Sequence, residues 1–117
     1  MAMRIRYGEL PNYQIQEFKK SLRSAIFFVL LCVDPNTAAE HSDIDVNQLF
    51  DNLLLKIGGY NALMNYPKEI IEVMSLLEAA RLEYNKEQFN FAVCRKLILD
   101  AGAEVNRIKE DGVADTE

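Results

Sequence analysis

The chain has 117 residues, of which 50% are hydrophobic and 26% charged, and its formal net charge is −5. This length suits one domain, and the composition is that of a globular protein rather than a disordered or fibrous one. An acidic chain lacks the concentrated positive field that nonspecific binding to nucleic acid or to anionic membranes requires.

The N-terminal residues 1–11 predict an extended arm. The alternation in "RIRY" lasts only four residues, and "GELPN" interrupts it. Asn12 then predicts the N-cap of a first helix that ends at Val33, because the following Asp34-Pro35 pair disfavours helical backbone. Spacings of three and four residues place the apolar side chains of this helix in one stripe: Ile15, Phe18, Leu22, Ala25, Ile26, Val29, Leu30 and Val33.

A second helix is predicted to begin at Asp45, which has the spacing of a capping box with Gln48. The pair Gly58-Gly59 predicts its end, because glycine readily adopts the left-handed backbone that terminates helices. "YNALMN" then predicts a turn or one short helical segment.

Pro67 predicts the first turn of a third helix, and Asn85 with Gln88 predicts the start of a fourth. Inside the fourth helix, Gly102 indicates a kink or a close contact between helices. Four amphipathic helices with short connections predict an all-α fold. The predicted organisation is a single-domain bundle of about four helices over residues 12–109, with the extended arm before it and a disordered acidic tail over residues 110–117.

The most apolar stretch lies in the second half of the first helix. Residues 25–33 contain no polar group other than the thiol of Cys32. As a helix they rise about 14 Å, roughly half of the hydrocarbon core of a bilayer, so they do not span a membrane. Phe27, Phe28, Leu31 and Cys32 lie outside the stripe, which leaves two alternatives open. Either this half-helix runs through the middle of the domain, or part of it, with these residues at the interface, is buried between subunits.

The charges are distributed unevenly along the chain. Basic residues concentrate before position 30, including Arg4 and Arg6 in the arm, whereas the segment 34–51 holds five acidic residues and no lysine or arginine. In the interface hypothesis, Arg4 and Arg6 of one copy bind the acidic segment of a neighbour, including Asp43 and Asp45. The alternative is a solvated surface with an acidic loop and tail.

Residues that carry chemistry are few. His41 is the only histidine and lies in an acidic loop, distant in sequence from both cysteines, so no nucleophilic triad is predicted. "DIDVN" begins like a calcium loop, but the sixth position is Gln48 and the twelfth is Leu54. One histidine and two distant cysteines do not make a zinc site. We therefore expect a non-enzymatic protein with no catalytic residue, metal or cofactor.

By elimination, the sequence favours a protein that works by protein–protein contact. The leading hypothesis is a homo-oligomeric structural or assembly subunit, such as a component of phage or mobile-element morphogenesis. A small adaptor or inhibitor that binds a different protein is second, and a DNA-binding module that uses Lys19, Lys20 and Arg23 is third. Nucleic acid and membranes are not favoured as partners.

The expected location is the cytoplasm, or the virion if the chain is phage-encoded. Both cysteines have apolar neighbours typical of buried free thiols in a reducing compartment. The first residues, "MAMRIRYGEL", do not resemble a secretory signal.

Overall fold

The computed structural model describes residues 2–5, 8–63 and 67–108. Two short strands, β1 (Ala2–Ile5) and β2 (Gly8–Pro11), pair as an antiparallel hairpin. The helices that follow are α1 (Asn12–Val33), the 3-10 helix η1 (Ala38–His41), α2 (Val46–Leu63), α3 (Lys68–Tyr84) and α4 (Phe91–Val105). The predicted all-α bundle is confirmed, and the arm is extended backbone that folds back on itself. The predicted tail, residues 110–117, lies outside the described residues.

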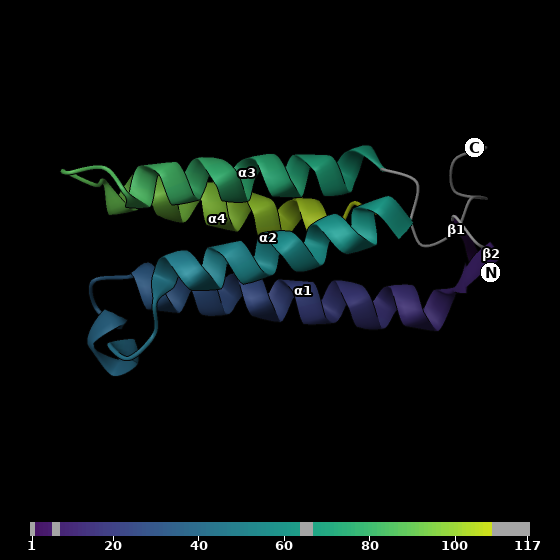
Figure 1. Ribbon diagram of the computed structural model, residues 1–117, viewed down its shortest axis with the longest axis horizontal. Coiled ribbons are helices and arrows are strands. Elements are labelled where there is room, and N and C mark those ends of the chain that lie inside the picture. Colours follow the sequence, from purple (N-terminus) through teal and green to yellow (C-terminus); the bar gives the residue numbers. More distant parts are fainter. Residues whose placement is uncertain (1, 6–7, 64–66, 109–117) are drawn as a thin grey trace.

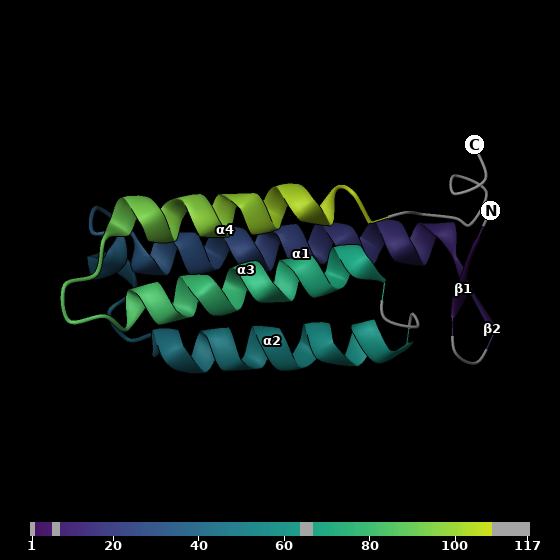
Figure 2. The ribbon, with the colours of Figure 1, turned by 90° about the horizontal axis from the view of Figure 1, so that it is seen from above.

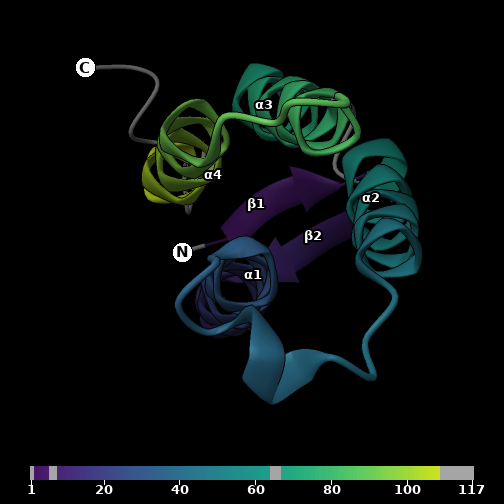
Figure 3. The same ribbon diagram turned by 90° about the vertical axis from the view of Figure 1, so that its left-hand side faces the viewer.

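The four long helices pack side by side in chain order, and α4 closes the ring against α1 (Figure 3). Each helix runs opposite to the one before it, so the connections lie at the two ends of the bundle (Figure 1). The α1–α2 loop and the α3–α4 turn share one end, whereas the hairpin lies at the other, beside the start of α1 (Figure 2). The acidic loop and the arm are therefore at opposite ends of the molecule.

The core fills the space between the four helices. Apolar residues spaced by three and four positions face one another because this spacing keeps them on one side of each helix. The predicted stripe of α1 is buried apart from Ala25, which is half-buried. The other helices contribute Val46, Phe50, Leu53, Leu54 and Ile57 from α2, Ile70, Val73, Leu77 and Ala80 from α3, and Cys94, Ile98, Ala101 and Val105 from α4.

The predicted end of the second helix at Gly58-Gly59 is wrong, because α2 continues to Leu63. Neither glycine has the positive φ that a left-handed stop requires. One residue later, the ring of Tyr60 packs on Phe18 of α1, with 4.2 Å between the ring centroids. This contact between helices favours continued helix by more than the two glycines disfavour it.

The predicted start of the fourth helix at Asn85 is also wrong. Asn85 is instead the C-cap residue of α3, and Asn90 caps α4, where its side chain accepts hydrogen bonds from the backbone N–H groups of Ala92 (2.9 Å) and Val93 (3.4 Å). Asn is a preferred N-cap residue, so Asn85 and its spacing from Gln88 suggested a helix start, whereas the cap forms five residues later.

At the start of α2, half of the predicted capping box forms. The carboxylate of Asp45 accepts a 3.2 Å hydrogen bond from the backbone N–H of Gln48. The side chain of Gln48 donates to Asn52 instead of returning to Asp45. The cap on this helix is therefore the acidic residue alone.

Candidate interaction surface

The structure separates the four apolar residues of α1 that lie outside its stripe. Cys32 is 5% exposed and belongs to the core of its own chain. Phe28 is half-buried against the core and meets the ring of His41 edge to face, with 5.3 Å between centroids. Leu31 is half-buried, whereas Phe27 is 57% exposed. Cys32 therefore lies in the core of its own chain, whereas the burial of Phe27 between subunits stays a prediction.

The segment after α1 accounts for this division. It turns back at Asp34, whose backbone carbonyl accepts from the N–H of Ala38 at 2.7 Å, and the hydroxyl of Thr37 donates to the carbonyl of Leu31 at 2.6 Å. These bonds hold η1 against α1, with His41 on Phe28. Phe27 instead lines a recess together with residues of α4.

Phe27 lines a groove of about 320 Å³ between α1 and α4. Leu99 of α4, 41% exposed, lines it as well. The groove is lined mainly by apolar side chains, of which Ile26, Leu30 and Ile98 are buried. An apolar groove with an exposed aromatic residue at its edge is typical of a contact surface for another protein.

Gly102 also lines this groove and explains part of its depth. The helix α4 is continuous through Gly102. A Cβ atom at this position would lie 3.9 Å from Cγ2 of Ile26, an ordinary van der Waals distance. Packing against α1 therefore leaves room for a methyl group here, and the glycine keeps that space open to the groove.

Polar groups close one end of the groove. The guanidinium of Arg23 donates a 3.0 Å hydrogen bond to the side-chain oxygen of Asn106. Lys19, 4% exposed, donates to the backbone carbonyls of Asn106 (3.3 Å) and Ile108 (2.9 Å), where the last carbonyls of α4 lack helical partners. Of the basic cluster considered for DNA binding, Lys19 is thus buried and Arg23 hydrogen-bonded, whereas Lys20 is exposed.

The acidic residues of segment 34–51 differ in their surroundings. Asp45 caps α2, and Asp51 forms an ion pair with Arg81. Asp43 and Glu40 are exposed and form no ion pair with any residue that the structure describes. The side chains of Arg4 and Arg6 lie outside the described part, so the contact of the arm with a neighbour's acidic segment stays a prediction.

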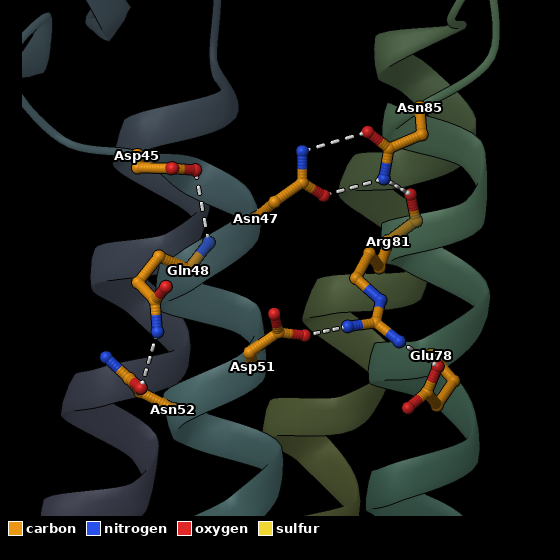
Figure 4. A network of polar contacts seen from close by, with 8 residues as sticks. All are labelled: Asp45, Asn47, Gln48, Asp51, Asn52, Glu78, Arg81 and Asn85. Atoms are coloured by element: carbon orange, nitrogen blue, oxygen red, sulfur yellow. Dashed lines mark hydrogen bonds and ion pairs between the residues drawn. The ribbon is translucent and has the colours of Figure 1, made fainter.

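A polar network between α2 and α3 was not anticipated from the sequence (Figure 4). Asn47 and Asn85 exchange two hydrogen bonds between their side-chain amides, at 2.7 and 3.0 Å. One turn away, Arg81 binds both Asp51 and Glu78. The only sequence signal for this network is a set of polar residues at helical spacing on each helix. Its groups bond one another across the helix pair, so it serves to align α2 with α3.

A second, more polar notch lies between α1 and α2. Its volume is about 390 Å³, and Phe18 and Tyr60 form its apolar wall. Lys56 donates a weak 3.4 Å hydrogen bond to Ser21 across it. Glu17 brings a charge of opposite sign to the same notch, so its lining does not select one class of charged ligand.

The two thiols are unsuited to nucleophilic chemistry at neutral pH. Burial raises the pKa of Cys94 to about 11, and the nearby carboxylate of Glu83 adds to this. Burial, with Asp43 as the second cause, also raises the pKa of Cys32. Both thiols are therefore protonated at neutral pH, and Sγ of Cys94 lies 3.6 Å from the carbonyl oxygen of Ala80.

Two further findings concern metals and membranes. In residues 2–5, 8–63 and 67–108, no three His, Cys, Asp or Glu side chains are grouped so that they could share a metal ion. Over the same ranges, no helix combines the length and the hydropathy of a membrane span.

Comparison of the chain with models of known protein families, with curated proteins and with solved structures finds no match.

Proposed function

We propose that this protein is a non-enzymatic interaction module that acts as a homo-oligomeric assembly subunit, with the groove between α1 and α4 as its contact surface. The observation that carries the proposal is the exposure of Phe27 at the edge of an apolar groove. Burying a phenylalanine side chain contributes about 2 kcal/mol or more, and aromatic residues in central pockets dominate the affinity of many interfaces.

A second copy is a suitable partner because the same face carries both a projecting side chain and a recess. Phe27 projects from α1, and the groove between Leu99 and α1 is open where Gly102 lacks a side chain. A surface of this kind can be complementary to itself, which a two-fold interface between identical chains requires. This complementarity favours self-assembly over an adaptor role.

The position of Lys19 weighs against the DNA-binding alternative. A phosphate contact needs an exposed cation, but Lys19 is buried and bonded to the end of α4. The remaining exposed charge of that cluster is too small to offset a net charge of −5.

The experiment is the solution mass of the purified chain, measured by light scattering across a hundredfold range of concentration. We expect a mass of twice 13.4 kDa or more for the natural chain. Phe27→Asp should return the mass to 13.4 kDa while the helical circular dichroism signal is retained. Phe28→Asp is the less informative change, because Phe28 also packs on His41 and the core.

The matched control is Leu55→Asp, because Leu55 is 79% exposed on α2 and does not line the groove. This variant should keep the mass of the natural chain. A natural chain of 13.4 kDa at every concentration would overturn the homo-oligomer and direct the search to a different protein partner. Equal loss of association in both variants would overturn the assignment of the groove.

A further inference from the structure

We infer that two copies pair through antiparallel α1 helices, about a two-fold axis that passes beside Phe27. This inference rests on the homo-oligomer proposed above and adds the face, the direction and the register of pairing. Three features carry it: the spacing of the residues on the exposed side of α1, the signs of their charges and the position of Gly102 on α4.

The exposed side of α1 has the spacing of a helix-pairing seam. Four residues of α1 and the first residue after it follow one another at intervals of four and three, and each is exposed or half-exposed: Lys20, Ser24, Phe27, Leu31 and Asp34. This alternation places side chains along one side of a helix, where a second helix can lie against them. Phe27 and Leu31 supply its apolar part, and Ser24 is small enough for a second helix to approach closely.

The charges at the two ends of this seam have opposite signs. Lys20 lies seven residues before Phe27 and Asp34 seven residues after it, so each is about 10 Å from Phe27 along the axis. A two-fold axis beside Phe27 brings Lys20 of one copy opposite Asp34 of the other. Asp34 leads into the loop that carries Glu40 and Asp43, which form no ion pair with any described residue.

Charge complementarity therefore selects the antiparallel direction. In a parallel pair, Lys20 would face Lys20 and the acidic loops would face each other. Like charges placed opposite one another disfavour an interface, whereas opposite charges at its rim set orientation and increase the rate of association. In the antiparallel pair, Lys20 of each copy can contact Asp34 of the other at the same time.

Gly102 supplies the space that the aromatic rings need. Phe27 belongs to the seam and also lines the groove, so the two Phe27 rings of an antiparallel pair share the space between the two grooves. The backbone at Gly102 does not require glycine, since its φ is not positive and a Cβ would have an ordinary contact. The lack of a side chain at Gly102 therefore matters mainly at the outer surface, where it leaves space in the groove.

The test is a crosslinking experiment that leaves Phe27 in place. Lys20→Cys and Asp34→Cys are purified separately, mixed and treated with a short bis-maleimide reagent. We expect several-fold more crosslinked dimer in the mixture than in either variant alone. The natural chain is the background control because Cys32 and Cys94 are buried, and Leu55→Cys controls for random collision.

The outcomes separate this inference from the proposed function. Crosslinking of Lys20→Cys to itself, at least equal to that of the mixture, would indicate parallel helices and overturn the inference while self-assembly stands. A dimer by mass without seam crosslinks would place the interface on another face. This result would also overturn the inference while self-assembly stands. A monomeric mass would overturn both. Circular dichroism and the solution mass of each variant verify that it folds and assembles.

Discussion

The ammonium group of Lys19, near the start of α1, donates a 2.9 Å hydrogen bond to the backbone carbonyl of Ile108, just beyond the end of α4. A second bond, of 3.3 Å, reaches the carbonyl of Asn106. These carbonyls follow the last turn of α4 and have no helical N–H to accept from. One buried cation thus joins the first and last helices of the bundle and holds one end of the groove in place.

Lys19→Met should lower the free energy of unfolding by about 2 kcal/mol, because hydrogen bonds from a charged donor are lost while the aliphatic part of the side chain is retained. Lys20→Met is the matched control, because Lys20 is next to Lys19 in the chain but is exposed. Lys20→Met should change the free energy of unfolding by about 0.5 kcal/mol or less. Urea unfolding at low protein concentration measures both, and equal effects would contradict the role of Lys19.

Asn90→Ala should destabilise the protein by about 1 kcal/mol, because the N–H groups of Ala92 and Val93 lose their acceptor. Gln88→Ala is the control: the sequence placed Gln88 in a capping box, but the structure leaves it exposed in the turn before the helix. Its replacement should have little effect on the urea midpoint. A larger effect for Gln88 than for Asn90 would restore the earlier helix start.

Glu83 predicts a dependence of stability on pH. Its carboxylate accepts from the backbone N–H of Asn90 at 3.0 Å and from Lys86 at 2.9 Å, which lowers its pKa below the ordinary value of 4.5. A lowered pKa in the folded state means that stabilisation is fully present above pH 4.5 and is lost as the pH falls through the folded pKa.

The measurement is the urea midpoint of the natural chain and of Glu83→Gln between neutral pH and pH 3. We expect the natural chain to be more stable at neutral pH and the difference to shrink as the pH falls below 4.5. Glu87→Gln, at an exposed position, should follow the natural chain throughout. A difference for Glu83→Gln that does not change with pH would show that the carboxylate charge is not the cause.

Gly102→Ala should stabilise the monomer by up to about 1 kcal/mol, because alanine favours helix and its methyl group meets no close atom. The same change should weaken self-association, since the methyl group occupies the floor of the groove. Gly59→Ala is the control, because a Cβ there has no neighbour within 4 Å and Gly59 does not line the groove. It should stabilise the helix and leave the solution mass unchanged. Equal association of the two variants would contradict a role for the groove floor.

Local spacing predicted the elements well. The intervals of three and four residues in α1 identified its buried face, and Asp34-Pro35 marked its end, because both effects act within one or two helical turns. The predicted end of the second helix failed where a contact with a distant residue was present. The α2 helix passes Gly58-Gly59 while Tyr60 packs on Phe18, a residue 42 positions earlier in the chain.

The sequence by itself determined that this chain forms four amphipathic helices, that the second half of α1 is too apolar to stay fully solvated, and that its charges are separated along its length. Only the tertiary structure decided that Cys32 enters the core, that η1 covers part of Phe28 and that Phe27 stays outside beside Gly102. The reason is physical: helix periodicity sets the direction of each side chain, but its burial depends on which distant segment packs against that direction.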